Sequence, residues 1–206
     1  ILEKPNTIKK LHGIDYSFNL CNEFIKHTSR YQVKTSASVC DIFSDELDAS
    51  IKFDWVYSGG LTEHFYGSKF DKVLEAHDKY VRPGGYISIS VPNFNGLNYL
   101  WHYIFDRPSL FKHNLMAMRP EPYISFFENT GYRTIFCAYV DKPHFWGLTS
   151  GELITNPVLK ASYFNISEKV RRNLNKVMEY IYAGNSEAIS GLHWRPYFLY
   201  IAKKSK

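Results

Sequence analysis

Residues 53–93 constrain this chain most, because they predict two strands joined by one helix. Apolar runs rich in β-branched and aromatic residues predict strands at 55–57 and 86–91. Between them, apolar residues recur at three- and four-residue steps over 69–81, which predicts an amphipathic helix, and Pro83-Gly84-Gly85 ends it. Connections this short make a βαβ crossover, so we expect the two strands to be parallel neighbours.

The carboxyl ends of these two strands carry small residues. Ser58-Gly59-Gly60 follows the first strand and Pro92-Asn93 follows the second. Ligands of open parallel sheets bind beyond this edge, and glycine lets a backbone approach a ligand closely. The edge is therefore a candidate binding site.

Length and composition narrow the choices. With 206 residues we expect a single domain, 1–206, with a sizeable core. The 16 tyrosines and 15 phenylalanines indicate a Tyr-rich core or, alternatively, an aromatic-lined pocket. The net charge of +5 comes without a dense basic run, so nucleic-acid binding is not indicated.

Cys21, Cys40 and Cys137 form no CxxC pair. This pattern favours reduced thiols in a cytoplasmic protein over disulfides, and we expect no metal site. The sequence contains no apolar run near the ~18 residues of a membrane span and no visible signal peptide.

The rest of the chain continues the alternation of strand and helix. Strands are expected at 11–15, 37–40, 132–140 and 197–203, and helices at 18–27, 120–129 and 167–182. Residues 92–119 are expected to be irregular and aromatic-rich. The alternation predicts an α/β three-layer sandwich.

The pattern FDxVxSxxLxEH, then a helix, then VxPGGxxxxxxPN across residues 53–93 resembles motifs IV to VI of the class I, Rossmann-like methyltransferases that use S-adenosylmethionine. The resemblance extends upstream through 12–17 and 39–43, and more loosely downstream through 126–132 and the terminal strand. It implies a mostly parallel seven-stranded sheet with the last strand antiparallel. It also implies S-adenosylmethionine as cofactor.

The resemblance assigns the adenosine half of the cofactor to four residues. Asp15 ends a strand, where a carboxylate can accept hydrogen bonds from both ribose hydroxyls. Tyr16 would lie against the adenine, while Asp41 would receive its amino group and Ile42 would contribute a backbone amide. The alternatives are a helix-capping Asp15, a surface Tyr16 and a turn Asp41.

The same resemblance places Ser58, Gly59 and Gly60 against the methionine end of the cofactor. A turn that merely needs positive φ is the alternative reading. His64 would face the methyl acceptor and remove a proton from a hydroxyl, since imidazole titrates near neutral pH. Alternatively, the Glu63-His64 pair only stabilises the start of the following helix.

Four further residues are candidates for the acceptor pocket, because they lie in or beside the segments expected over the open edge of the sheet. Each has packing as its alternative role. They are His113, Tyr123, His144 and Trp146.

The glycine-rich first motif of the family is not evident. Ile1-Leu2-Glu3 resembles its first strand, but Lys4 follows and no glycine occurs before Gly13. Either a loop is missing between Glu3 and Lys4, which the start at Ile rather than Met favours, or the protein lacks the motif.

We therefore expect an enzyme that transfers a methyl group from S-adenosylmethionine to a small-molecule acceptor by in-line attack. A catalytically silent methyltransferase-like binding or partner subunit is the alternative. The chain reads SGGL after Tyr57, which disfavours DNA amino methylation, and no GxGxxG supports a nicotinamide dehydrogenase.

Residues 142–195 separate the last two strands and are expected to form a small helical cap over the acceptor site. The apolar face of its helix must be buried, and we expect it to pack on 93–119. A homodimer interface is the alternative. This face comprises Val170, Leu174, Val177, Met178 and Ile181.

Overall fold

The computed structural model describes residues 8–31, 33–44, 50–142, 144–146, 156–184 and 195–206. The chain divides into two compact units, residues 1–52 (unit 1) and 53–206 (unit 2). The expected break between Glu3 and Lys4 lies outside the described residues, as does the segment that resembles the first strand of the family.

Unit 1 is a small βαβ element. Strands β1 and β2 pair in parallel, from Lys10 opposite Lys34 to Asp15 opposite Val39, and α1 connects them. The helix begins where Ser17 Oγ accepts a hydrogen bond from the Leu20 amide, which is an N-cap. In chain order the elements are β1 (Lys10–Asp15), α1 (Phe18–Thr28), η2 (Ser29–Tyr31) and β2 (Lys34–Val39).

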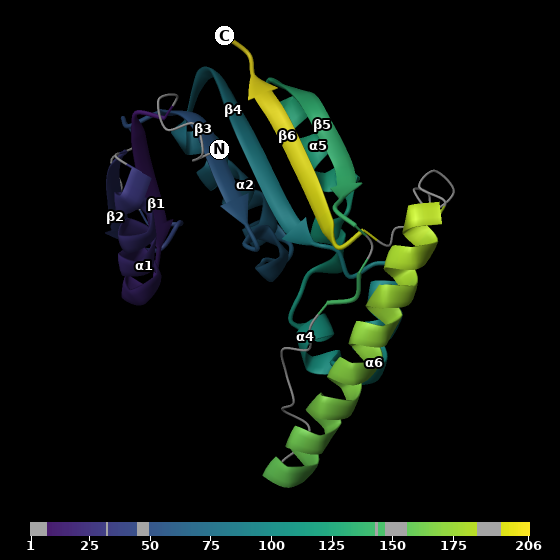
Figure 1. The fold of residues 1–206 in the computed structure, drawn as a ribbon. Coiled ribbons are helices and arrows are strands. Elements are labelled where there is room, and N and C mark those ends of the chain that lie inside the picture. Colours follow the sequence, from purple (N-terminus) through teal and green to yellow (C-terminus); the bar gives the residue numbers. More distant parts are fainter. Residues whose placement is uncertain (1–7, 32, 45–49, 143, 147–155, 185–194) are drawn as a thin grey trace. The chain divides into compact units, whose positions relative to one another are not determined.

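Unit 2 contains the rest of the described elements. Figure 1 shows them in chain order by colour. They are β3 (Phe53–Gly59), η3 (Thr62–His64), α2 (Ser68–Tyr80), β4 (Val81–Pro92), α3 (Leu97–Phe105), α4 (Arg107–Phe111), η4 (Leu115–Met118), α5 (Pro120–Asn129), β5 (Tyr132–Val140), α6 (Pro157–Gly184) and β6 (Tyr197–Lys204).

The sheet of unit 2 has the strand order β3-β4-β6-β5 (Figure 1). Strands β3 and β4 are parallel neighbours, as the pattern of residues 53–93 predicts. The last strand, β6, lies between β4 and β5 and is antiparallel to both. The antiparallel last strand is therefore confirmed.

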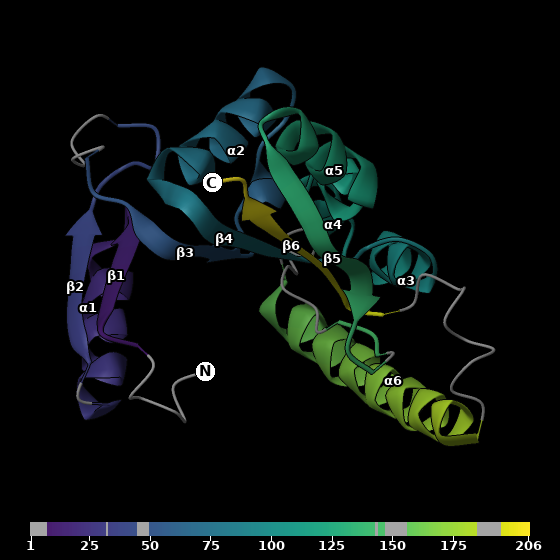
Figure 2. The ribbon, with the colours of Figure 1, turned by 90° about the horizontal axis from the view of Figure 1, so that it is seen from above.

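One face of this sheet is covered by α2 and α5 (Figure 2). The side chains that point to these helices are fully buried and include Ile87, Ile89, Phe198 and Tyr200. On the other face, Trp55 donates its indole N–H to Ser88 Oγ at 2.7 Å and stays half-exposed. The sheet of unit 2 and the helices α2 and α5 form two layers of the α/β arrangement that the sequence predicts.

The expected seven-stranded sheet is wrong for the described residues, which form a four-stranded and a two-stranded sheet. The apolar pattern itself indicates six strands, and all six are present. The seventh came only from the family resemblance, through Ile1-Leu2-Glu3, and that segment lies outside the described residues.

Two other expectations need correction. Residues 92–119 are not irregular, since they contain α3, α4 and η4. Helix α6 begins ten residues before the expected Ser167, because Asn156 Oδ1 accepts from the amides of Val158 and Leu159. Ser167 lies inside the helix and donates its hydroxyl back to the Tyr163 carbonyl oxygen. None of the described helices is both long enough and apolar enough to cross a membrane.

Candidate active site

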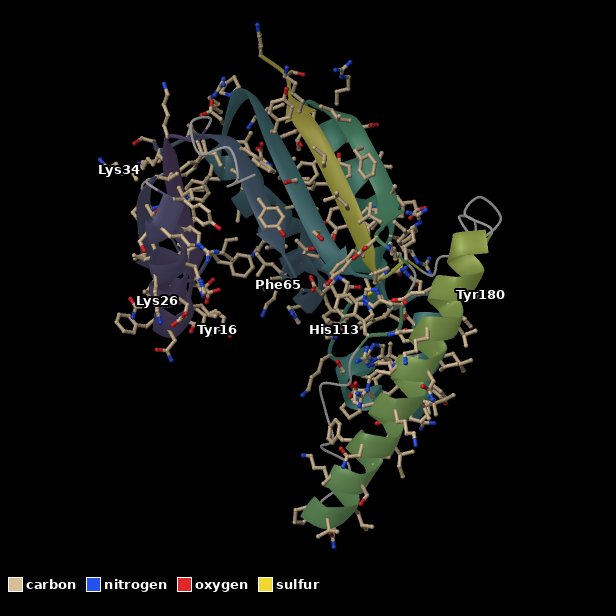
Figure 3. The ribbon with its side chains drawn as sticks, in the orientation of Figure 1. Tyr16, Lys26, Lys34, Phe65, His113 and Tyr180 are labelled. Carbon is tan, nitrogen blue, oxygen red and sulfur yellow. The ribbon has the colours of Figure 1, made fainter. Side chains whose placement is uncertain are left out.

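A cavity of about 680 Å³ opens in unit 2 beyond the carboxyl ends of β3 and β4. This is the edge that the βαβ pattern indicates as a binding site. Figure 3 shows the labelled His113 just past the arrowheads of these strands. The lining residues are Tyr57, Gly59, Gly60, Glu63, His64, Ser90, Val91, Pro92, Phe94, His102, Ser109, Lys112, His113, Trp146 and Tyr197.

The turn after β3 places Glu63 and His64 in the wall. Gly60 has φ of +69°, a conformation that favours glycine, and its amide donates to the Ser90 carbonyl oxygen at 2.9 Å. Behind the turn, Thr62 Oγ1 lies 2.7 Å from the Tyr123 hydroxyl, which donates to the Ala117 carbonyl oxygen at 2.6 Å. The short helix η3 is therefore anchored to the core.

Glu63 is a buried acid at the cavity. Its side chain is 1 % exposed, and its Oε2 has no hydrogen-bond partner among the described residues. Removal from water disfavours the charged form and raises the pKa of Glu63 to about 7. This carboxyl group can thus exchange a proton near neutral pH.

His64 and His113 face each other across the cavity wall, with ring centroids 4.8 Å apart. His113 Nδ1 lies 2.6 Å from the Ser109 carbonyl oxygen, so this nitrogen carries the proton and Nε2 carries the lone pair. Burial, and secondarily the nearby His113, lowers the pKa of His64. A neutral His64 imidazole can accept a proton.

His102 is a further cavity residue, which the sequence pattern did not single out for a site. Its ring lies 4.2 Å from that of Phe94, and Nδ1 is 3.8 Å from Asp106 Oδ2. Burial lowers the pKa of His102 to about 4 despite this carboxylate. Neither ring nitrogen of His102 has a hydrogen-bond partner among the described residues.

Aromatic side chains form much of the remaining wall. Trp146 packs edge-on against Tyr197 at 4.7 Å and against Phe94 at 6.2 Å between ring centroids. Its indole N–H donates to the Pro196 carbonyl oxygen at 3.1 Å, which fixes the ring. The cavity therefore combines flat apolar surfaces with imidazole and carboxyl groups.

Two of the four acceptor-pocket candidates line the cavity and two do not. His113 and Trp146 line the cavity. Tyr123 does not, because its ring is fully buried between α5 and the sheet and its hydroxyl joins η3 to η4. His144 lies outside the cavity too, with Nδ1 3.1 Å from the Lys142 carbonyl oxygen.

In unit 1, Asp15 is the last residue of β1 and Asp41 lies two residues past the end of β2, its parallel neighbour. The Cys40 amide donates to the Asp15 carbonyl oxygen at 3.1 Å. Asp15 Oδ1 accepts from the Ser17 amide at 2.7 Å, and Asp41 Oδ1 accepts from the Phe43 amide at 2.9 Å. Each carboxylate thereby stabilises a turn with one oxygen. The N-cap of α1 is Ser17, and Asp15 accepts a hydrogen bond from the amide of this residue.

The other cofactor candidates differ in exposure. Tyr16 is 84 % exposed, and Ile42 is half-buried beside Asp41. Gly59 and Gly60 line the cavity of unit 2, whereas Ser58 is buried next to them and is not among the lining residues. Gly60 has a positive φ, as the turn alternative requires, and it also lines the cavity. The two roles of Gly60 are therefore compatible.

Helix α6 packs on α3 rather than on the cavity. Met178 clusters with Trp101 and Phe145, and the Tyr163 hydroxyl donates to the Phe105 carbonyl oxygen at 2.7 Å. Of the apolar face expected to pack on residues 93–119, Met178 does so, whereas Val170, Leu174 and Val177 are exposed. None of the described residues of α6 lines the cavity, to which residues 142–195 contribute Trp146.

No protein-family model and no curated protein matches the sequence. Solved structures do resemble the protein. A SAM-dependent methyltransferase from Archaeoglobus fulgidus is 16 % identical, and the match covers 96 % of this chain and 86 % of that one, with a TM-score of 0.54. The N-methyltransferase NodS from Bradyrhizobium japonicum WM9, in complex with S-adenosyl-L-homocysteine, is 9 % identical over 100 % of this chain and 84 % of that one, with a TM-score of 0.52.

A geranyl diphosphate methyltransferase in complex with SAM is 12 % identical, over 95 % of this chain and 69 % of its own length, with a TM-score of 0.53. At such identities the likeness establishes the fold alone. The chain has a class I S-adenosylmethionine-dependent methyltransferase fold.

Proposed function

We propose, from this methyltransferase fold, that the protein binds S-adenosylmethionine and transfers its methyl group to a small-molecule acceptor. The observation that carries the proposal is the cavity beyond β3 and β4, with Gly59 and Gly60 in its wall. Ligands of open α/β sheets bind at this edge, so the cavity lies where the fold would hold a substrate.

Unit 1 supplies the residues that we assign to the adenosine of the cofactor. Asp15 would accept hydrogen bonds from the ribose hydroxyls, and Asp41 from the adenine amino group. Tyr16 would lie against the adenine, and its exposure leaves its ring available for stacking. Ile42 would offer its backbone amide to the adenine.

Unit 2 supplies the residues that we assign to the methionine end and the acceptor. Gly59 and Gly60, with Ser58 before them, would allow close approach of the methionine part. The sulfonium methyl is already a strong electrophile, so catalysis would consist mainly of aligning the acceptor atom with it. For a hydroxyl acceptor, His64 would take the proton as general base, which its lowered pKa supports.

The chemistry of the cavity favours a flat, largely apolar acceptor. Phe94, Trp146 and Tyr197 present aromatic faces and edges. Neutral His102, with both ring nitrogens unpartnered among the described residues, would hydrogen-bond a polar substituent of such an acceptor. The proposed acceptor is therefore a small aromatic molecule with at least one polar group.

We also propose residues 142–195 as a cap on the acceptor side. Trp146 provides its contact with the cavity, and α6 supports α3 through Met178 and Trp101. The cap would exclude water and limit acceptor size. Val170, Leu174 and Val177, from the apolar face named in the sequence analysis, are exposed, so a homodimer through this face stays a prediction.

The test is a calorimetric titration of the protein with S-adenosyl-L-homocysteine, combined with a melting-temperature shift. We expect saturable binding and a ligand-dependent rise in melting temperature. Adenosine and methionine alone serve as controls for the two halves of the ligand. Absence of heat and of a melting shift would contradict the proposal and support a catalytically silent methyltransferase fold instead.

A further inference from the structure

Three metal-ligating side chains converge on one wall of the cavity. Glu63, His64 and His113 each offer one ligand atom, and these atoms lie within 4.8 Å of one another. Glu63 and His64 come from η3, whereas His113 follows α4 about fifty residues later. All three residues line the cavity, so an ion has a route to them.

We propose that Glu63, His64 and His113 bind a divalent transition-metal ion, with Zn²⁺ as the preferred occupant. Two imidazoles and one carboxylate form a donor set that suits Zn²⁺ and its first-row neighbours. Mg²⁺ and Ca²⁺ prefer oxygen ligands throughout and fit this set less well. The sequence predicts no metal site because its cysteines form no CxxC pair. The proposed donor set contains no cysteine, so this pattern does not exclude it.

The buried carboxyl group of Glu63 is the first argument. The residue is 1 % exposed and lines the cavity, yet its Oε2 has no hydrogen-bond partner among the described residues. A carboxylate removed from water without compensation is costly, and buried charges are normally paired or coordinate metals. A cation at this place would supply the missing partner.

The orientation of His113 is the second argument. Its Nδ1–H donates to the Ser109 carbonyl oxygen at 2.6 Å, which leaves the Nε2 lone pair for a ligand. Metal-ligating histidines almost always donate their other ring N–H to a carbonyl or carboxylate, which fixes tautomer and ring orientation. Ser109 is itself a cavity residue on α4.

The third argument is that hydrogen bonds hold the two ligand-bearing segments together. The Asn114 amide donates to the Glu63 carbonyl oxygen at 2.7 Å, and Asn114 Nδ2 donates to the Phe65 carbonyl oxygen at 2.7 Å. Asn114 follows His113, while Glu63 and Phe65 flank His64. The three ligands therefore stand on one connected framework.

The three ligand atoms must move slightly closer together to bind one ion. Ligand atoms on one tetrahedral Zn²⁺ lie roughly 3.4 Å apart, given metal–ligand distances of about 2.1 Å. Rotation of the His64 imidazole ring, whose outer torsion is broad, can close much of the difference from 4.8 Å, while the Ser109 hydrogen bond holds the His113 ring. Three protein ligands leave a fourth position, as in catalytic zinc sites.

This inference concerns metal binding and stands independently of methyl transfer. The ion and a base role for His64 exclude each other while the ion is bound, because both use its imidazole lone pair. A bound ion would instead lower the pKa of a hydroxyl group that coordinates to it.

The experiment uses Co²⁺ as a spectroscopic probe of the chelator-treated full chain, with Zn²⁺ as competitor. We expect one equivalent of Co²⁺ to produce visible absorption bands of a nitrogen- and oxygen-ligated site, and Zn²⁺ to abolish them. Glu63→Gln, His64→Ala and His113→Ala should each weaken Co²⁺ binding by at least about 10- to 100-fold, since even second-shell changes cost that much.

The chain offers a matched control, the exposed Glu23–His27 pair on α1, whose Oε2 and Nε2 lie 3.4 Å apart. His27→Ala should leave the Co²⁺ titration unchanged. Glu63→Gln is nearly isosteric, so it decides the matter if a histidine variant fails to fold, as judged by circular dichroism.

The proposal is overturned if the wild-type protein develops no visible band with Co²⁺, or if Glu63→Gln binds Co²⁺ as tightly as wild type. It is also overturned if His27→Ala removes the binding. Binding of S-adenosyl-L-homocysteine in metal-free protein is a separate readout, so failure of either proposal can be recognised without the other.

Discussion

The two units present their candidate residues in opposite environments. In unit 1, Asp15 is half-buried and Asp41 exposed, and each accepts a hydrogen bond from an amide two residues further on. In unit 2, Glu63 is fully buried with an unpartnered oxygen. The difference indicates that local turns fix the carboxylates of unit 1, while the groups of unit 2 depend on packing to set their protonation.

The hydrophobic core of unit 1 is also smaller than that of unit 2. The buried apolar residues of unit 1 are few among those described, namely Cys21, Val33 and Cys40. Unit 2 has a continuous aromatic core, in which Tyr123 stacks on Tyr200 and packs against Phe198 at 5.8 and 5.4 Å between ring centroids. The following predictions test this comparison, from the largest expected effect to the smallest.

Phe198→Ala should destabilise unit 2 by about 3–5 kcal/mol, because it removes a fully buried ring and leaves a cavity. The measurement is urea unfolding followed by tryptophan fluorescence, which reports on unit 2 alone because Trp55, Trp101, Trp146 and Trp194 all lie there. Phe136→Ala, on the same sheet but 40 % exposed, is the control. If the two variants lost the same free energy of unfolding, the burial of Phe198 would not explain its contribution to the stability of unit 2.

Glu63 should make unit 2 less stable as pH rises. Its pKa is about 7 in the folded protein and near 4.5 when unfolded, so the folded state holds the extra proton between these values. The stability present below pH 4.5 is then lost as pH rises through 7, by up to about 3 kcal/mol. Urea unfolding at pH 5 and pH 8, with a chelator present, measures this loss.

Glu63→Gln should remove this pH dependence, while Asp41→Asn in unit 1 should leave it unchanged. A wild-type protein equally stable at both pH values would mean that Glu63 is better solvated or paired than the structure shows.

Asp15→Ala should weaken the binding of S-adenosyl-L-homocysteine by roughly 1.5–3 kcal/mol, the range for hydrogen bonds to a charged group. Asp15→Asn separates two roles, since it keeps an acceptor for the Ser17 amide but loses the charge. Calorimetric titration measures both. An affinity of Asp15→Ala within about twofold of wild type would contradict the ribose assignment.

Tyr123→Phe should cost about 1–2 kcal/mol of stability, because it removes the hydroxyl that joins Thr62 to the Ala117 carbonyl oxygen. Tyr66→Phe is the control, since its exposed hydroxyl makes one long hydrogen bond of 3.4 Å to the Phe111 carbonyl oxygen. Thermal unfolding compares the two. A variant of unchanged stability would restore Tyr123 as a candidate for ligand contact.

Much of unit 2 could be predicted from local patterns. The βαβ unit at 53–93 follows from apolar periodicity, although α2 ends at Tyr80 and Pro83-Gly84-Gly85 lies within β4. The strands β5 and β6 follow from their own residues, but their pairing was not predicted. Residues 92–119 could not be assigned in this way. Large apolar residues of α3, among them Tyr99, Leu100 and Ile104, are exposed, so apolar spacing does not mark the buried face of this helix.

The candidate site was predicted in part. The strand-end rule indicates Gly59 and Gly60, and the family resemblance adds His64; all three line the cavity. The partnership of Glu63 and His64 with His113 could not be predicted, because it depends on hydrogen bonds of Asn114 across about fifty residues. Tyr123 was a wrong choice for the acceptor pocket, since a buried tyrosine and a pocket tyrosine look alike in a sequence.

The position of β6 between β4 and β5 has a consequence for how the chain folds during synthesis. When β5 leaves the ribosome, β6, its partner among the described strands, is not yet made, and more than fifty residues must follow before β6 appears. Until then β4 and β5 expose unpaired edges, which are prone to association with other chains. Unit 2 should therefore complete its sheet only after β6 emerges, and slow translation of residues 141–196 would prolong its dependence on chaperones.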